Sequence, residues 1–186
     1  EINKKYAEKE MEVSLPLFMI GFKDNIKDKY NEVVKRHIAI EIILNMLIGK
    51  SSNLYNELYK EGYLLSQPDL EYEFGNEYSH VLIGGQSKDP RKVYEKIAEK
   101  IQEMKNNDIN VQEFERIKKK IYGDYAVEYN NVADIGRMFT SDYIKGINSF
   151  EYMDKFEEID AEYAKQVLKE IFTEDKMIMS VIKGKN

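Results

Sequence analysis

Hydrophobic and polar residues follow a period that changes several times along the chain, and the clearest pattern lies in residues 30–48. Apolar residues recur there at helical spacing, and nine of the eleven positions in residues 38–48 are apolar. A helix that is apolar on almost every side is a buried one. Its polar exceptions, His37, Glu41 and Asn45, recur at every fourth position and form a single stripe. The pattern predicts a long core helix with one polar face.

Four segments have the alternation or apolar content of strands, namely 12–23, 70–78, 79–86 and 176–183. The first carries Pro16, which suits a first or edge strand better than a central one. Glycine weakens the interior of a strand, so we expect bulges or bends at Gly75 and at the pair Gly84-Gly85. Together the segments predict a mainly antiparallel sheet of about four strands.

Several amphipathic segments predict helices that lie on this sheet. Gly49 ends the long helix, residues 51–53 offer an N-cap, and a short helix over residues 54–61 stops at Gly62. Further helices are expected at 91–104, from 111 onward, and at 132–144, 151–156 and 161–172. No repeat or low-complexity linker separates these elements. We therefore expect residues 1–186 to form a single domain, with an α+β fold and helices packed on one face of the sheet.

The amino-acid composition mainly excludes certain classes of function and binding site. The chain has 28 Lys and Arg against 34 Asp and Glu, interspersed, and no cysteine. This balance argues against a nucleic-acid groove, a disulfide framework and a thiol nucleophile. No apolar run approaches a membrane span, and the charged N-terminus lacks both an initiating methionine and a signal-peptide core. We expect a cytoplasmic protein with no nucleic-acid or membrane partner, and a chain that is a piece of a longer one.

Few side chains offer catalytic chemistry. His37 and Glu41 share a helical face, but two-residue metal patterns often arise by chance, so a solvated or hydrogen-bonded stripe is the favoured interpretation. Ser51 and Ser52 lack the G-x-S-x-G surroundings of a nucleophile, and helix capping is favoured. A weaker hypothesis is a small-molecule enzyme with a pocket near His37, Glu41 and His80. The fourteen tyrosines could line a peptide groove, although half-buried packing is favoured.

Two longer segments of the sequence resemble the corresponding segments of a known protein family. Residues 41–64, EIILNMLIGKSSNLYNELYKEGYL, followed by two strands and the helix of DPRKVYEKIAEKI, resemble the non-catalytic half of the insulinase-like (pitrilysin) zinc metallopeptidases. Residues 113–146, EFERIKKKIYGDYAVEYNNVADIGRMFTSDYIKG, are similar to the corresponding part of the bacterial relatives of the processing proteases. The resemblance extends over nearly all of residues 10–184 and implies the α+β fold of one metallopeptidase half-domain.

In that family two similar halves face each other across a chamber, and the resemblance implies that the zinc site belongs to a half outside this sequence. The family's catalytic helix has the form H-x-x-E-H-M-L-F, which we compare with residues 41–48. Glu41 and Asn45 then stand where the family has histidines, and Leu44 stands where it has the catalytic glutamate. Because leucine cannot deprotonate water, the resemblance implies no zinc and no peptidase activity in this chain alone.

The leading hypothesis is the non-catalytic, C-terminal lobe of a zinc-dependent peptidase. It would complete a peptide-enclosing chamber with a zinc-bearing N-terminal lobe of the same chain or with a paired homologous subunit. The alternative is a scaffold or partner-binding subunit of the same architecture without peptidase activity. The family's non-catalytic half often grips substrate through an arginine and a tyrosine, but residues 77–87 contain no arginine and place His80 near that position. Candidate chamber-facing or peptide-contacting residues are His37, Glu41, Asn45, Ser51, Ser52, Tyr78 and His80.

Overall fold

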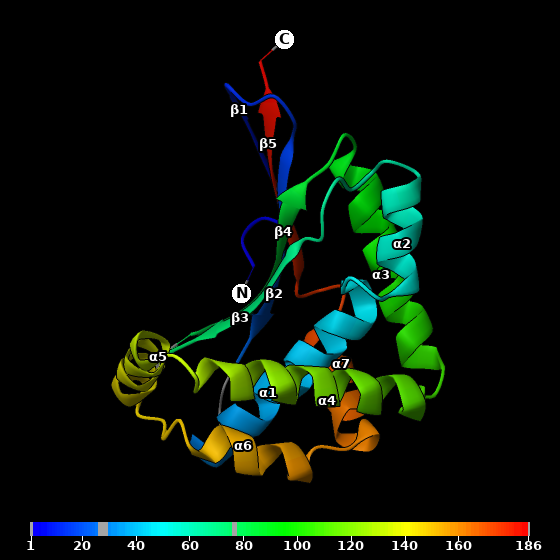
Figure 1. Cartoon of the computed structure of the whole chain (residues 1–186). Coiled ribbons are helices and arrows are strands. Elements are labelled where there is room, and N and C mark those ends of the chain that lie inside the picture. The colour runs from blue at the N-terminus through cyan, green and yellow to red at the C-terminus, as the bar shows by residue number, and fades with distance from the viewer. Residues whose placement is uncertain (1, 26–29, 76–77, 186) are drawn as a thin grey trace.

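The computed structural model describes residues 2–25, 30–75 and 78–185, and Figure 1 shows its elements. The strands are β1 (Tyr6–Met11), β2 (Leu17–Asp24), β3 (Asp69–Phe74), β4 (Ser79–Gln86) and β5 (Met177–Gly184). The helices are α1 (Tyr30–Ile48), α2 (Asn53–Lys60), α3 (Pro90–Asn106), α4 (Val111–Glu128), α5 (Val132–Lys145), α6 (Glu151–Lys155), the 3-10 turn η1 (Phe156–Glu158) and α7 (Ala161–Ile171). The predicted strand over residues 70–78 ends at Phe74, and residues 76–77 lie outside the described ranges.

The strands form one sheet in the order β1-β5-β2-β4-β3. β1 runs parallel to β5, and every other neighbouring pair is antiparallel. The helices that pack on the sheet cover one of its faces (Figure 1). The predicted α+β class is confirmed, and the expected count of about four strands is corrected to five within the described ranges.

The strand missing from the prediction is β1, whose sequence YAEKEM has no apolar face. All of its residues except Tyr6 are exposed, and its only neighbour among the described strands is β5. Lys183 of β5 lies 2.7 Å from Glu8 and 3.5 Å from Glu10, so charge ties the two strands together. Charged side chains are typical of an outer strand because they discourage pairing with other chains. Hydrophobic alternation therefore could not reveal it.

The outer position expected for residues 12–23 is wrong, because β2 lies in the middle of the sheet between β5 and β4. Pro16 precedes the strand, so the ladder needs no N–H donor from it. The expected bulge at Gly84-Gly85 is also absent, since β2 and β4 pair residue for residue through both glycines. A Cβ on Gly85 would lie 3.2 Å from the ring of Phe18. A larger residue at position 85 would crowd this ring, which explains why a glycine occupies the position.

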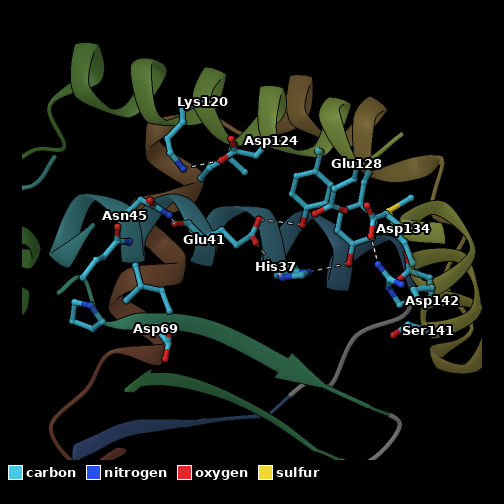
Figure 2. Close-up of a pocket in the computed structure, with 18 residues that line it drawn as sticks. His37, Glu41, Asn45, Asp69, Lys120, Asp124, Glu128, Asp134, Ser141 and Asp142 are labelled. Atoms are coloured by element: carbon cyan, nitrogen blue, oxygen red, sulfur yellow. Dashed lines mark hydrogen bonds and ion pairs between the residues drawn. The ribbon is translucent and has the colours of Figure 1, made fainter. Parts of the chain in front are cut away.

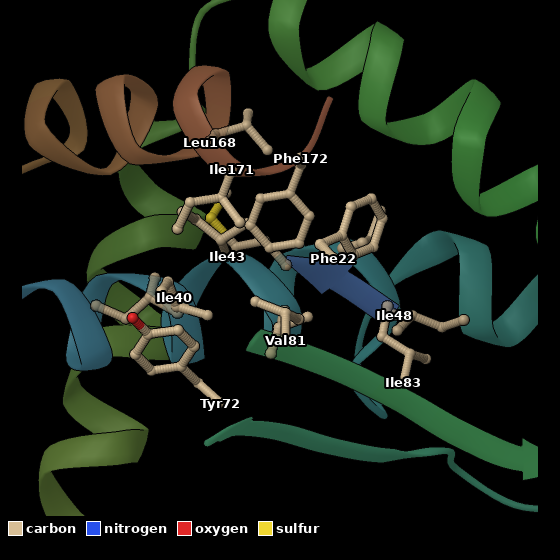
Figure 3. Packing of buried hydrophobic residues seen from close by; sticks show 14 of the residues in the cluster. Phe22, Ile40, Ile43, Ile48, Tyr72, Val81, Ile83, Leu168, Ile171 and Phe172 are labelled. Atoms are coloured by element: carbon tan, nitrogen blue, oxygen red, sulfur yellow. The ribbon is translucent and has the colours of Figure 1, made fainter. Parts of the chain in front are cut away.

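Helix α1 crosses the covered face of the sheet and is enclosed by its neighbours. Its residues with at most 1% exposure are Val34, Ile38, Ala39, Ile40, Ile42, Ile43, Leu44, Leu47 and Ile48. Figure 3 shows how side chains from α1, the sheet and α7 meet; Phe22 and Phe172 have ring centroids 4.9 Å apart.

No helix among the described residues is long and apolar enough to cross a membrane. The cytoplasmic location stays a prediction.

The connection between α1 and α2 has the structural role that its sequence predicts. Ser52 caps α2, and its hydroxyl accepts a hydrogen bond from the N–H of Tyr55 at 3.1 Å. The N–H of Gly49 donates to the carbonyl of Asn45 at 3.0 Å. Gly62 follows α2 with φ at 69°, a left-handed conformation that glycine adopts at little cost. The segment fixes α2 against the end of α1.

A buried ion pair joins several elements at one end of the sheet. Asp24 is 4% exposed and accepts hydrogen bonds from Nε and Nη2 of Arg36, both at 2.9 Å, and from the hydroxyl of Tyr72 at 2.8 Å. Burial opposes ionisation of Asp24, but the bonds and charge of Arg36 more than offset it and hold the pKa of Asp24 below its ordinary value. Arg36 also reaches Glu170 of α7 at 2.8 Å.

We predict that Asp24→Ala lowers the free energy of unfolding by about 3 kcal/mol, because it leaves the partly buried Arg36 without its main partner. Glu170→Gln, at the exposed end, should cost less than about 1 kcal/mol. Since folding lowers the pKa of Asp24, its contribution should be present above the unfolded pKa and lost as the pH falls through the folded value. Urea unfolding across acidic pH checks this, and equal losses in the two variants would contradict it.

Two glycines should respond to alanine with opposite signs. A Cβ on Gly49 would lie 2.5 Å from the carbonyl oxygen of Asn45, so Gly49→Ala should destabilise the fold, by about 1–3 kcal/mol. A Cβ on Gly123, inside α4, would meet nothing within 4 Å. Gly123→Ala should therefore stabilise by about 0.5–1 kcal/mol through helix propensity. Thermal unfolding measures both, and a shift of the same sign in the two variants would refute the packing argument.

Candidate functional site

The polar stripe of α1 opens into a groove of about 1030 Å³. In Figure 2, α4 runs along one side of this groove, β3 along the other, and α1 lies between them. The predicted stripe residues His37, Glu41 and Asn45 all line it. Its other lining residues include Asp69 and Leu70 from β3, Lys120, Ile121, Asp124, Tyr125 and Glu128 from α4, Asp134, Arg137, Met138 and Asp142 from α5, and Tyr152 from α6.

His37 is held as a neutral imidazole. Its Nδ1 lies 2.9 Å from the hydroxyl of Tyr152, and the rings of Tyr72, Phe74 and Tyr152 surround it at centroid distances of 5.6, 5.4 and 5.7 Å. Burial, together with the charge of Lys145, lowers the pKa of His37 to about 3. The ring therefore stays uncharged at neutral pH and acts through hydrogen bonding and packing.

Glu41 lies one turn further along α1 and faces the groove. Its Oε2 accepts a hydrogen bond from the hydroxyl of Tyr125 at 3.1 Å, while its Oε1 lies 3.8 Å from Nε2 of His37, too far for a hydrogen bond. Burial raises the pKa of Glu41 to about 7, although the bond from Tyr125 acts in the other direction. The rings of Tyr125 and Tyr152 stack with centroids 5.3 Å apart. These contacts connect α1 to α4 and α6.

The next polar residue of the stripe, Asn45, turns part of its side chain toward the backbone. Its amide donates to the carbonyl of Glu41 at 2.9 Å. Leu44, beside it in sequence, is 1% exposed and belongs to the core. Within the described part of the chain, no group of three or more His, Asp or Glu side chains could hold a metal ion. Helix α1 thus presents a carboxyl, an amide and a neutral imidazole to the groove.

The two candidate serines lie outside the groove. Ser52 is 1% exposed as the cap of α2. Ser51 accepts a hydrogen bond from Nη2 of Arg116 at 3.2 Å. Ser52 therefore has the expected capping role, whereas the hydroxyl of Ser51 does not cap α2 and instead links the α1–α2 connection to α4.

Tyr78 and His80 also lie away from the groove. Their rings stack with centroids 5.9 Å apart. In β4, His80 precedes Val81, whose side chain is fully buried under the helices. Neighbouring residues of a strand point to opposite faces, so His80 faces the side of the sheet that the helices leave uncovered. The structure does not bring His80 together with His37 and Glu41.

The sequence prediction does not include the acidic side chains of the groove. Asp124 and Glu128 come from α4, and Asp134 and Asp142 come from α5. Residues four apart share a helical face, so the pair on α4 has a signal in the sequence. Whether that face looks toward α1 depends on how α4 packs, and no local pattern specifies this.

Comparison with known proteins identifies the family that this chain matches. Residues 3–121 match the family described as the peptidase M16 inactive domain. The chain is also 25% identical over 186 residues to the uncharacterized zinc protease YmfH of Bacillus subtilis (strain 168), a match that covers 98% of this chain and 43% of that protein.

Solved structures show the same fold. An M16-like peptidase from Alicyclobacillus acidocaldarius matches with a TM-score of 0.90 at 22% identity, over 97% of this chain and 44% of that one. A peptidase M16 inactive domain from Pseudomonas fluorescens matches with a TM-score of 0.76 at 15% identity, over 98% of this chain and 43% of that one. The chain spans less than half the length of these relatives.

We predict that Glu41→Gln changes the pH dependence of stability. Folding raises the pKa of Glu41 from 4.5 to about 7, so between these values the folded protein binds more protons than the unfolded one. Its contribution to stability therefore falls as the pH rises through this range. Glutamine does not titrate, so the free energy of unfolding of the wild type minus that of the variant should decrease by about 1–3 kcal/mol from about pH 5 to 8.

The control for this experiment is Glu99→Gln. The side chain of Glu99 is 71% exposed on α3, outside the groove. This variant removes one carboxyl group away from the groove. A pH dependence for Glu41→Gln no larger than that for Glu99→Gln would contradict a raised pKa at Glu41.

Proposed function

Because the chain belongs to the family of peptidase M16 inactive domains, we propose that it forms the non-catalytic lobe of a zinc-dependent peptidase and completes a peptide-enclosing chamber. This membership confirms the resemblance found in the sequence. The observation that carries the proposal is the polar stripe of helix α1, where Glu41 and Asn45 line the groove; in the comparison with the family's catalytic helix, these two residues stand where that helix has histidines. Leu44, at the position of the catalytic glutamate, is buried in the core.

The partner in this proposal is a zinc-bearing lobe. The match covers 43% of YmfH and 44% of the Alicyclobacillus peptidase, so these relatives have room for a second lobe of similar size. Residues 1–186 are then one C-terminal lobe of a longer protein, and the zinc belongs to the other lobe. A paired homologous subunit could supply that lobe equally well.

The groove on α1 is the proposed wall of the chamber. Its stripe residues His37, Glu41 and Asn45 are the proposed peptide contacts, since they face an open cavity large enough for several residues of a peptide. A neutral imidazole, a carboxyl and an amide can hydrogen-bond a peptide backbone. The groove therefore contacts substrate, while hydrolysis belongs to the other lobe.

A second candidate is a scaffold or partner-binding subunit of the same architecture. One observation favours it. Residues 77–87 contain no arginine to grip a substrate, and in the same segment Tyr78 and His80 stack on each other. In this case the surface that would enclose a peptide serves as an interface with another protein.

We predict that this chain alone does not cleave unstructured peptides and that it binds the separately produced zinc-bearing lobe. An interdomain contact of roughly 600–1,500 Å² is expected to be modest and reversible, because a chamber has to open for its substrate. Sedimentation velocity of the mixed lobes measures association. A fluorogenic peptide mixture should be hydrolysed faster by the mixture than by the zinc-bearing lobe alone.

Two results would count against this function. No association at about 100 μM, together with full activity of the zinc-bearing lobe alone, would remove the chamber-completing role and favour the scaffold. Hydrolysis by this chain alone, persisting through rigorous purification and chelation, would place catalytic groups in the lobe itself.

A further inference from the structure

The edge strand β3 borders the groove with backbone groups that no described strand pairs. β3 is the last strand of the sheet, and the N–H of Gly75 donates to the carbonyl of Tyr78 at 2.8 Å. In an antiparallel pair of strands, every second residue directs its N–H and C=O groups to the partner strand, and the residues between them direct theirs away. Counting from Gly75, which bonds to Tyr78 just before β4, the residues whose backbone groups point away from β4 are Leu70, Tyr72 and Phe74. A free edge of this kind can accept an extended peptide.

The groove beside this edge is acidic. Its carboxyl groups are those of Glu41, Asp69, Asp124, Glu128, Asp134 and Asp142, and its Lys and Arg residues are Lys120 and Arg137. Both cations already have partners, because Nζ of Lys120 lies 2.7 Å from Asp124 and Arg137 pairs with Asp134. Among the side chains that the structure describes, the remaining carboxyl groups form no ion pair with a lysine or arginine.

The pKa of Glu128 reflects this imbalance of charge. Burial, with the charges of Asp134, Asp124 and Asp142, raises the pKa of Glu128. Burial also raises the pKa of Asp142, although a hydrogen bond from Ser149 and the charge of Lys145 act the other way. Carboxyl groups that repel one another hold protons more tightly. A cation entering the groove would relieve this repulsion.

The groove also has apolar side chains in its lining. Leu70 of β3, Ile121 of α4 and Met138 of α5 line the same groove. A lysine or arginine side chain has an apolar stem and a charged head, and both parts find a matching surface here. A bare metal ion needs several oxygen ligands converging on one point, and among the described residues no group of three or more His, Asp or Glu side chains does so. The lining therefore suits long basic side chains.

We propose that the groove binds an extended peptide segment through its lysine or arginine side chains. This inference rests on the proposed function and adds the chemistry of the peptide. With the peptide backbone along β3, every second side chain points to the same side. Basic residues at alternate positions would then reach the acidic wall of α4 and α5, which faces β3 across the groove (Figure 2).

The test uses the whole 186-residue chain and three fluorescein-labelled peptides of about ten residues, enough for a strand beside β3. They share one uncharged background and carry arginine, glutamine or glutamate at the same alternating positions. Fluorescence anisotropy measures their affinities. At about 50 mM salt the arginine peptide should bind at least about tenfold more tightly than the glutamine peptide, and about 300 mM salt should remove most of this advantage.

Paired variants locate the site. Asp69→Asn combined with Glu128→Gln removes two exposed carboxylates of the groove without touching the core. This double variant should weaken binding of the arginine peptide about tenfold and leave the glutamine peptide unchanged. Glu99→Gln combined with Glu162→Gln removes the same charge from exposed positions on α3 and α7, and should leave both affinities unchanged. Thermal unfolding verifies that every variant is folded.

Several outcomes would overturn the proposal. These are equal binding of the arginine and glutamine peptides, and equal losses in the two double variants. Displacement of the arginine peptide by an equal concentration of spermidine would assign the groove to free polyamines instead. Lobe association is measured separately. If the two lobes associate but the arginine peptide has no advantage, only this inference is wrong. If the arginine peptide is preferred but the lobes do not associate, the proposed chamber is wrong and the chain is a peptide-binding subunit.

Discussion

The burial of α1 is the constraint on which the rest of the structure depends. A helix that is apolar on almost every side has to be covered on almost every side, and burying each large aliphatic side chain contributes roughly 1.5–3 kcal/mol. The sheet lies under α1, α7 packs beside it, and α4 and α6 approach from other sides. Among the described side chains of α1, the cover is incomplete at the stripe of His37, Glu41 and Asn45 and near the start of the helix, where Glu32 is exposed. The groove is therefore an open side of a largely enclosed helix.

Under the proposed function, the partners of the stripe residues explain why α1 would contact a peptide and not hydrolyse it. Polar groups near a core need partners, because an unpaired one loses its hydration without compensation. Here two tyrosines provide them, Tyr152 for His37 and Tyr125 for Glu41. Each contact also ties α1 to a neighbouring helix. Side chains that hold the wall of the groove together in this way are not free to converge on a reacting atom.

Local physics explains which parts of the fold could be predicted. The long core helix, the cap at Ser52 and the polar stripe follow from short-range patterns of apolar residues, glycines and hydroxyls, and each is present in the structure. β1 has no such pattern, because its six residues are held by pairing with β5 and by ion pairs to Lys183. The central position of β2 depends on β5, which returns from the far end of the chain.

The groove could be predicted only in part for the same reason. The stripe on α1 has a period that can be read in the sequence, whereas the two sides of the groove come from β3, α4 and α5, segments widely separated along the chain. The acidic residues of α4 and α5 belong to ordinary solvated helix faces until the helices pack. Tertiary structure alone brings Asp69 and Glu128 to the same groove as Glu41.

Charge in the groove and closure of a chamber would not be independent. A second lobe placed over the groove would exclude water and lower the effective dielectric constant, which strengthens repulsion among the carboxyl groups. An empty acidic chamber would therefore resist closure, or would close only after taking up protons at residues such as Glu41 and Glu128. A basic peptide supplies the missing positive charge and removes this penalty. By thermodynamic linkage, a peptide that favours the closed state must also bind more tightly when the lobes are closed. The acidic wall would then make closure of the chamber sensitive to the charge of the peptide inside it.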